Sequence, residues 1–215
     1  MVGDLSALLI DADDRQVFHL KRSGRYEPES LQAWADMIQY GDTVLDVGAY
    51  TGLYSILAAK KGATVYALEP MPANAWRCSC NFDLNQYPGN IKLLRTAASD
   101  EMGIVSLHYN RRVPLTTGGS INGRGSMHNE TMDVPTIKID ALALTTKVSA
   151  MKIDVERHER AVIKGAIRLI ERDRPKLLIE TLDAEMSEDL LKLLPGYDAA
   201  ATLDGRNTLY VPRQS

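Results

Sequence analysis

Short apolar runs alternate with amphipathic segments along most of this 215-residue chain. The runs are rich in Val, Ile and Leu, which is typical of strands buried on both faces of a sheet, and the segments between them repeat apolar residues at helical spacing. This alternation predicts an α/β fold with a doubly wound, mostly parallel, Rossmann-like sheet of seven strands. The predicted helices are 28–40, 52–61, 73–85, 158–169 and 190–194, and the predicted strands are 43–47, 64–68, 91–94, 148–153, 176–179, 197–203 and 208–211.

Both ends of the chain carry antiparallel patterns. Residues 6–10 and 16–20 flank a turn signal at Asp13-Asp14, which predicts an N-terminal hairpin. Near the other end, Asp204-Gly205 separates the last two apolar runs and fits a hairpin turn. We therefore expect an antiparallel C-terminal edge on the sheet and a hairpin-and-helix extension in front of it.

We expect residues 1–215 to form a single domain, because no internal repeat or linker divides the sequence. Residues 1–40 would hold the hairpin and the first helix, and residues 41–215 the ligand-binding core. Two further alternating runs, at 103–109 and 134–139, predict additional strands.

The stretch TVLDVGAYTG at 43–52 joins a strand to a helix through a glycine turn. Gly48 allows a sharp turn and the close approach of a ligand, because it has no Cβ. The next strand ends on Glu69, 21 residues later, where a carboxylate can accept hydrogen bonds from both ribose hydroxyls. The spacing D-x-G-x-x-x-G differs from the G-x-G-x-x-G that seats a pyrophosphate, so it favours S-adenosylmethionine (SAM). The alternative is an ordinary α/β turn that binds no ligand.

Carboxylates end four of the predicted parallel strands. In an open α/β sheet ligands bind beyond the carboxyl ends of the strands, so these acids form a rim suited to a cationic cofactor and to deprotonating a substrate. Crowding would raise one pKa, which suits a general base, and the same rim could hold a divalent cation. Each acid also has a structural alternative as a helix cap. The residues are Asp46, Glu69, Asp154 with Glu156, and Glu180, with His158 close by as either a second base or a histidine satisfied elsewhere in the fold.

Composition narrows the class of partner. A net charge of −3 argues against general affinity for nucleic acid or for an anionic membrane. Cys78 and Cys80 lie two apart in a predicted helix and point to different sides, so we expect reduced thiols. The apolar run at 5–10 is short and is followed by acidic residues, which fits neither a signal peptide nor a membrane span. A cytoplasmic protein is expected.

Residues 110–132 form a long stretch with almost no apolar periodicity. Long loops in compact domains are often lids or binding segments. Arg111, Arg112 and Arg124 would then bind an acidic substrate group. The alternative is a plain surface loop on which all three arginines are solvated.

Seven segments of the chain carry a more specific pattern. The block of lysine, an apolar residue, Asp, Val and Glu at 152–156 is the most specific of them. Together with the glycine turn, the set resembles the FkbM-like SAM-dependent methyltransferases, over most of the chain from about Tyr26 to Glu180. The segments are YEPE (26–29), GDTVLDVGAYTGLYS (41–55), ALEPMPAN (67–74), AASD (97–100), TIKIDAL (136–142), MKIDVERHE (151–159) and PKLLIET (175–181).

The resemblance implies a class I methyltransferase fold and transfer of the SAM methyl group, commonly to a hydroxyl of a natural product, sugar or lipid. It implies that Glu69 binds the ribose, that Ala98 lies beside adenine, and that Asp154 with Glu156 faces the reacting centre. Our hypothesis for the mechanism takes Asp154 as the first choice for the general base, with Glu156 and Glu180 as supports. No metal is predicted. Taken together, the predicted cofactor-binding residues are Asp46, Gly48, Ala49, Tyr50, Thr51, Gly52, Glu69, Pro70, Ala98 and Asp154, and the predicted catalytic residues are Asp154, Glu156, Glu180 and His158.

Two positions depart from the family pattern. The family usually has asparagine at position 50, where this chain has Tyr50, and glycine at position 157, where it has Arg157. Tyr50 follows the turn glycine and should be tolerated. Arg157 places a bulky cation between Glu156 and His158, which bears on the choice of acceptor more than on use of the cofactor.

Two other functions fit the same fold. The first is a catalytically silent SAM- or adenosine-binding module, which Arg157 would favour. The second is a nicotinamide-dependent oxidoreductase, which the missing G-x-G-x-x-G and the lack of a Tyr-x-x-x-Lys pair argue against. An N-methyltransferase acting on nucleic acid would carry an Asn/Asp-Pro-Pro-aromatic motif, and none is present. We therefore expect a small-molecule acceptor, with no nucleic-acid or membrane partner.

Overall fold

The main sheet has seven strands, and its order confirms the predicted fold class. The strands are β1 (Thr43–Val47), β2 (Thr64–Leu68), β3 (Ile91–Leu94), β7 (Val148–Ile153), β8 (Lys176–Glu180), β9 (Tyr197–Leu203) and β10 (Asn207–Pro212). Their order is β3-β2-β1-β7-β8-β10-β9, in which the first five pair parallel and β10 runs antiparallel to β8 and β9. The structure is a computed structural model that describes residues 6–86, 90–112, 115, 119–121, 123 and 129–213.

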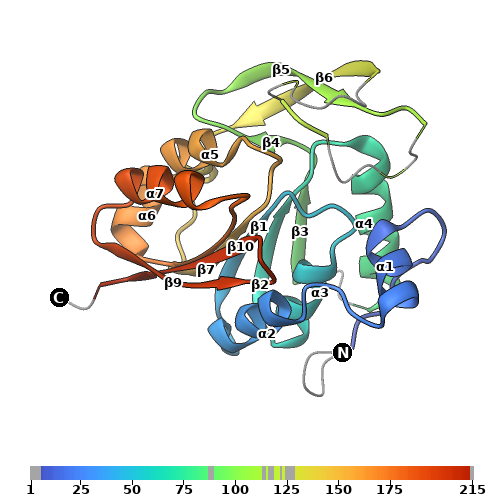
Figure 1. Cartoon of the computed structure of the whole chain (residues 1–215), viewed down its shortest axis with the longest axis horizontal. Coiled ribbons are helices and arrows are strands. Elements are labelled where there is room, and N and C mark those ends of the chain that lie inside the picture. The colour runs from blue at the N-terminus through green and yellow to red at the C-terminus, as the bar shows by residue number, and fades with distance from the viewer. Residues whose placement is uncertain are drawn as a thin grey trace.

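Helices cover both faces of this sheet (Figure 1). Successive residues of β1 point to opposite faces: Val44 packs with Trp34 on one side, and Leu45 packs with Ile163 on the other. Burial on both faces explains why the strands are apolar without alternation. One face carries α2 (Pro28–Met37), α3 (Leu53–Lys60) and α4 (Pro72–Leu84), and the other carries α5 (Glu159–Gly165), α6 (Ile167–Asp173) and α7 (Ala184–Leu193).

A second, smaller sheet lies across the top of the view in Figure 1. Its order is β4 (Ala97–Ala98), β6 (Glu130–Ile137) and β5 (Gly103–Tyr109), with β4 parallel and β5 antiparallel to β6. The expected strand at 103–109 is confirmed. The expected strand at 134–139 begins earlier, at Glu130, and therefore takes the last residues of the expected loop; residues 139–142 form the short 3-10 helix η1 (Ile139–Leu142). Arg124 lies outside the described residues.

The N-terminal extension contains a helix, so the predicted hairpin is wrong. The helix α1 (Arg15–Ser23) begins after Asp14, whose side chain accepts hydrogen bonds from Gln16 N and Val17 N. It ends at Gly24, which has a φ of +69°. The acidic pair that resembled a hairpin turn therefore contains a helix N-cap, because an Asp side chain serves both structures.

The segment before α1 is extended, and side chains of α4 and of its C-cap residue Asn85 hold it in place. Asn85 accepts from Leu8 N at 2.9 Å and donates to Leu8 O at 2.7 Å. Asn81 accepts from Ile10 N at 2.9 Å, and Arg77 donates to Ile10 O at 3.1 Å. These side chains take the place of a partner strand, and they fix α1 beside α4 (Figure 1).

The predicted helix at 158–169 is two helices. The first, α5, ends at Gly165, and α6 begins at Ile167, with Ala166 between them in a non-helical conformation. A Cβ at Gly165 would lie 2.0 Å from the carbonyl oxygen of Ser99. The break therefore coincides with a close backbone approach to the segment after β4. The predicted helix at 190–194 is the end of the longer α7.

Candidate active site

A cavity of about 250 Å³ opens at the carboxyl ends of β1, β2 and β7. Because β1 lies between β2 and β7, this is the point where the strand order reverses, and open α/β sheets bind ligands there. Among the predicted site residues, those that line the cavity are Gly48, Ala49, Tyr50, Glu69, Pro70, Ala98, Asp154 and Glu156. Those that do not are Asp46, Thr51, Gly52, His158 and Glu180.

The turn after β1 is fixed against both neighbouring strands. Gly48 N and Ala49 N donate to Leu68 O at 2.9 and 3.0 Å, and Asp154 N donates to Val47 O at 2.9 Å. Gly48 has a φ of +83°, and a Cβ there would lie 1.8 Å from the carbonyl oxygen of Asp154. No other residue fits without moving that backbone. The sequence pattern therefore identifies a turn that depends on glycine.

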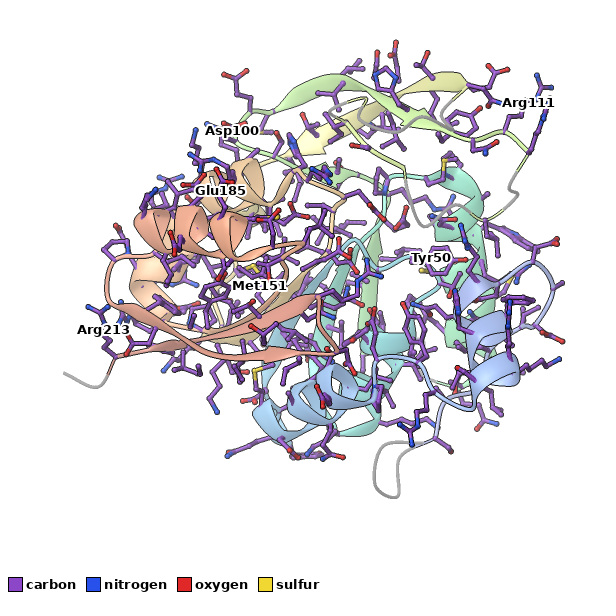
Figure 2. All side chains as sticks on the ribbon, in the orientation of Figure 1. Tyr50, Asp100, Arg111, Met151, Glu185 and Arg213 are labelled. Atoms are coloured by element: carbon purple, nitrogen blue, oxygen red, sulfur yellow. The ribbon has the colours of Figure 1, made fainter. Side chains whose placement is uncertain are left out.

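Tyr50 connects this turn to Glu69 and to α1. Its backbone is left-handed, with a φ of +52°, and its N–H donates to Glu69 Oε2 at 2.9 Å. Its hydroxyl accepts from Arg15 N at 3.1 Å, an amide in the first turn of α1 that has no partner within the helix. Figure 2 shows Tyr50 on the side of the molecule where α1 lies. The asparagine usual at this position adopts left-handed backbone more easily than tyrosine, whereas tyrosine reaches α1.

Three of the predicted cofactor residues lie in or next to the turn but do not line the cavity. Asp46 is fully buried, and its Oδ2 accepts from Ser55 Oγ at 2.6 Å; burial raises its pKa. Thr51 is also fully buried. Gly52 has a φ of +90°, and a Cβ there would lie 2.4 Å from the ring of Phe82. These residues therefore support the conformation of the turn through buried contacts and are not part of the cavity wall.

Glu69 directly follows β2, and backbone donors fix its carboxylate. Oε2 accepts from Tyr50 N, and Oε1 accepts from Met71 N at 2.9 Å and from Asn74 Nδ2 at 3.4 Å. The residue is only 5% exposed, and burial raises its pKa to about 7. Each carboxylate oxygen has two acceptor positions. Glu69 thus retains the capacity to accept a hydrogen bond from a ligand in the cavity.

A buried lysine joins the acidic groups on the β7 side. Lys152 Nζ lies 3.1 Å from Asp154 Oδ2 and 4.6 Å from the centre of the Tyr54 ring. The Tyr54 hydroxyl donates to Glu27 Oε2 at 2.7 Å. Burial opposes the charge of this lysine, but the surrounding carboxylates outweigh burial and raise its pKa; they belong to Asp154, Asp46 and Glu27. Lys152 is therefore charged, and Asp154 is engaged in an ion pair.

Glu156 differs from these acids. Within the part of the chain that the structure describes, no hydrogen bond or ion pair to its carboxylate is present. Burial, and then the nearby Asp154, raise its pKa to about 7. Glu156 and Arg157 both have left-handed backbone, with φ of +54° and +76°. Glu159 Oε1 holds this turn, because it accepts from Val155 N and Arg157 N at 3.2 Å each.

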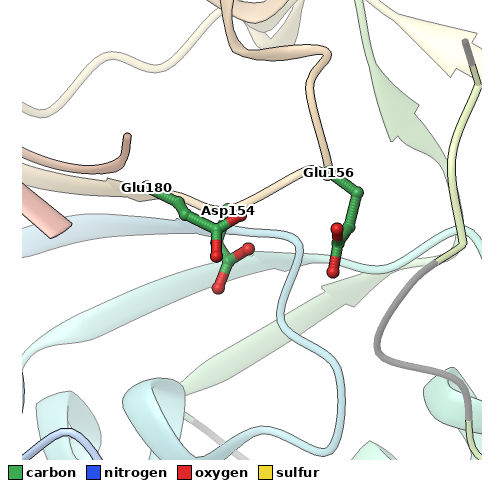
Figure 3. A group of neighbouring side chains, drawn as sticks. All are labelled: Asp154, Glu156 and Glu180. Atoms are coloured by element: carbon green, nitrogen blue, oxygen red, sulfur yellow. The ribbon is translucent and has the colours of Figure 1, made fainter. Parts of the chain in front are cut away.

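The carboxylates of Asp154, Glu156 and Glu180 come together at the strand ends (Figure 3). Their oxygens lie within 4.8 Å of one another, a spacing that could hold a divalent cation. Two of them already have cationic partners, because Asp154 pairs with Lys152 and Glu180 pairs with Arg206. Glu180 is buried, whereas Arg206 lines the cavity.

His158 lies away from the cavity wall. Its Nε2 is 3.0 Å from Ser99 Oγ, and burial lowers its pKa, so the ring is neutral. It occupies the N-cap position of α5, although its side chain makes no capping hydrogen bond. The geometry fits the alternative of a histidine satisfied within the fold.

Three charged residues near the site were not predicted from the sequence. Lys152 carried a signal, because a lysine inside an apolar strand is buried only beside a partner. Glu27 belongs to the YEPE segment but had no assigned role. Arg206 carried no signal, because it follows an ordinary hairpin turn and reaches the site only through the pairing of β10 with β8.

Comparison with known proteins decides the family. The family model described as "Methyltransferase FkbM domain" matches residues 46–199, which is well over half of the chain. The chain belongs to this family. The resemblance seen in its motifs is thereby confirmed.

The FkbM-family chain is similar to the hexuronic acid methyltransferase AglP of Haloferax volcanii. The two are 28% identical over 192 residues, which cover 80% of this chain and 74% of AglP. A shorter match is found with a tRNA1(Val) (adenine(37)-N6)-methyltransferase of Shewanella amazonensis, 35% identical over 91 residues, or 40% of this chain and 39% of that protein.

Solved structures of other methyltransferases share the fold. The methyltransferase FkbM of Methylobacillus flagellatus KT superposes with a TM-score of 0.56 at 20% identity; the match covers 80% of this chain and 43% of that one, so the present chain spans less than half of it. An rRNA methylase of Streptococcus thermophilus gives a TM-score of 0.57 at 11% identity, over 88% and 98% of the two chains. None of the helices in the described part of this FkbM-family chain has the length and apolar character needed to cross a membrane.

Proposed function

We propose that this chain is a SAM-dependent O-methyltransferase whose acceptor is a hydroxyl group of a small, sugar-like molecule. One observation carries the proposal: the cavity has the glycine turn on one side and Glu156, a carboxylate with no partner among the described residues, on the other. A carboxylate with a pKa of about 7 is matched to removing a proton from a hydroxyl near neutral pH.

The residues on the β2 side fit a nucleoside with unmodified ribose hydroxyls. Glu69 faces the cavity with one acceptor position to spare, which can take a hydrogen bond from a ribose hydroxyl. Its carboxylate would repel a 2′-phosphate. Ala98 offers a small apolar surface for an adenine ring. The acids on the β7 side suit a positive charge at the other end of the ligand. SAM, when bound, supplies a methyl group that its positively charged sulfur has already activated.

Glu156 is the general base in this proposal, in place of Asp154. Asp154 is engaged by Lys152, whereas the Glu156 carboxylate is open to a substrate proton. Glu156 would take the proton from the acceptor hydroxyl while the hydroxyl oxygen bonds to the methyl carbon, and the electron pair of the carbon–sulfur bond that breaks would remain on sulfur. Glu159 keeps Glu156 in place by holding the turn between them.

The choice of a sugar acid as first candidate acceptor rests on charge and on similarity. Arg15, His19 and Arg206 line the cavity and supply groups that can bind a carboxylate. The relative named above is a hexuronic acid methyltransferase. A net charge of −3 opposes binding of a polyanion such as RNA, on which some of the structural neighbours act.

The test is a methyl-transfer assay with several acceptors. The purified chain is incubated with SAM and with glucuronic acid, galacturonic acid, the matching neutral hexoses or total RNA, and S-adenosylhomocysteine is measured by mass spectrometry. We expect product with the uronic acids, as an ether that withstands mild alkali. A methyl ester, which alkali cleaves, would move the reaction to the carboxylate.

Three outcomes would contradict the proposal outright. Turnover with RNA alone would assign a different acceptor class. Binding of S-adenosylhomocysteine without turnover on a broad panel of hydroxyl compounds would favour the silent binding module. A titration with NAD, run in parallel, addresses the oxidoreductase, for which tight NAD binding and no SAM binding are required.

A further inference from the structure

Lys152 contacts the carboxylate of Asp154, and the carboxylates of Asp46 and Glu27 lie near enough to act on its ammonium group as well. Two of these three acids, Glu27 and Asp154, line the cavity. The third, Asp46, is buried behind the turn. Burying like charges is costly unless a cation compensates them. The carboxylates of Glu27 and Asp154 can therefore accept a further positive group from a ligand in the cavity.

Glu27 is held in an unusual conformation that faces this region. It occupies the N-cap position of α2 with a left-handed φ of +41°, yet its side chain makes no capping hydrogen bond. Its carboxylate instead accepts from the Tyr54 hydroxyl at 2.7 Å. A non-glycine residue in this conformation costs on the order of 1 kcal/mol and persists where the surroundings enforce it.

Another segment caps α2 in place of Glu27. Asp204, in the turn between β9 and β10, accepts from Glu29 N at 3.3 Å and from Ser30 N at 2.8 Å, and Asp204 N donates back to Glu29 Oε2 at 2.8 Å. The amide groups that an N-cap side chain normally satisfies are thus already bonded. The Glu27 carboxylate is left available to a ligand.

The position of these acids indicates which part of a ligand they meet. Glu69 follows β2 and Asp154 follows β7, on opposite sides of β1. A ligand whose ribose lies at Glu69 and which crosses the turn at Gly48 reaches Asp154 and Glu27 with its other end. In SAM that end is an amino acid.

We propose that Glu27, together with Asp154, binds the α-ammonium group of the methionine portion of SAM. The inference rests on the proposed function. Tyr54 orients Glu27 for this contact, and Lys152 balances part of the charge of Asp154. Glu27 is thereby a specificity residue that favours ligands carrying the α-ammonium group over analogues that lack it.

The test compares two ligands by isothermal titration calorimetry. One is S-adenosylhomocysteine, and the other is its analogue in which hydrogen replaces the α-amino group. Glu27→Gln is expected to weaken S-adenosylhomocysteine about tenfold or more, the loss typical of a hydrogen bond between charged groups, and the desamino analogue by no more than about twofold. Equal losses for both ligands, or no loss for either, would overturn the assignment.

Two control variants and two control measurements separate the possible failures. Glu185→Gln changes an exposed glutamate on α7, on the far side of the molecule from Tyr50 (Figure 2), and should leave both affinities unchanged. Tyr54→Phe keeps the Glu27 charge but removes its anchor, so a smaller loss for S-adenosylhomocysteine alone is expected, and equal losses would count against the proposal. If the unmodified chain binds neither ligand, the proposed function itself fails. Thermal melting of each variant without ligand excludes general misfolding.

Discussion

The two sides of the cavity are built in different ways. On the β2 side, backbone amides of the glycine turn bond to Leu68 and Glu69, so the wall is shaped by main-chain contacts. On the β7 side, the wall is a set of charges contributed by segments far apart in the sequence, and Glu156 has no partner in the described structure. The first side is rigid and suited to binding. The second holds excess charge and strained backbone, which suit chemistry.

The largest effect is expected at the turn itself. Gly48→Ala would place a Cβ 1.8 Å from the carbonyl oxygen of Asp154, so the backbones of two strands must separate. We expect the free energy of unfolding to fall by about 3 kcal/mol and S-adenosylhomocysteine affinity to fall at least about a hundredfold. Urea denaturation and calorimetry measure the two quantities.

Gly41→Ala is the matched control. Gly41 has nearly the same φ, +87° against +83°, but a Cβ at this position would have no neighbouring atom within 4 Å. The substitution should therefore cost only the backbone strain, about 1 kcal/mol, and leave binding unchanged. Similar behaviour of the two variants would show that contact with Asp154 is unimportant.

The second effect tests the β7 side by catalysis. Glu156→Gln removes the proposed base and should lower kcat by about a hundredfold or more, while S-adenosylhomocysteine affinity stays within about twofold. In the unmodified protein kcat should rise with pH through about 7, as Glu156 loses its proton. Asp154→Asn is the comparison, because it breaks the ion pair with Lys152 and should weaken cofactor binding as well. Unchanged kcat in Glu156→Gln would exclude the base role.

The same variant should be more stable than the parent above neutral pH. The pKa of Glu156 is raised from 4.5 to about 7 on folding, so the folded state binds the proton more tightly than the unfolded state. The stability that protonated Glu156 contributes is therefore fully present below about pH 4.5, and this contribution is lost as the pH rises through about 7. Glu156→Gln should recover about 1 kcal/mol at pH 8, after allowance for partial solvent screening, and little at pH 5. Equal stability at both values would contradict the burial of this charge.

The third effect addresses the β2 side. Glu69→Gln keeps the shape of the side chain but replaces an acceptor with a donor, so we expect about tenfold weaker binding of S-adenosylhomocysteine. Because the pKa of Glu69 is about 7, affinity in the unmodified protein should rise with pH through that value, and the variant should show a flatter profile. Affinity equal to the parent at pH 8 would place the ribose elsewhere.

Features that depend on local sequence were predictable, and features that depend on distant segments were not. The order of buried strands and helices, the glycine turn and the acid after β2 follow from periodicity and spacing. The N-terminal hairpin was wrong because the signal at Asp14 is shared by turns and helix caps. The network of Glu27, Lys152 and Arg206 comes from a loop, a strand and a hairpin, and no spacing rule connects them.

The two departures from the family pattern have a common physical basis that the sequence alone did not reveal. Tyr50 and Arg157 both have left-handed backbone, with φ of +52° and +76°, where the family usually has asparagine and glycine. Asparagine and glycine adopt this conformation at lower cost than other residues. At Tyr50 the cost is offset by the hydroxyl contact with Arg15 N. At Arg157 the backbone N–H donates to Glu159 Oε1 at 3.2 Å.

The smallest effect therefore concerns Arg157. Arg157→Gly and Arg157→Ala both lose the contacts of the side chain, but only glycine relieves the left-handed strain. We expect the glycine variant to be more stable than the alanine variant by about 1 kcal/mol in urea denaturation. A measurement of kcat sharpens the comparison, because Glu156 lies on the same turn. If strain at Arg157 positions the base, the glycine variant should gain stability and lose kcat. Its affinity for S-adenosylhomocysteine should stay unchanged. If Gly and Ala variants are equally stable, the turn is held by Glu159 alone and the strain contributes nothing.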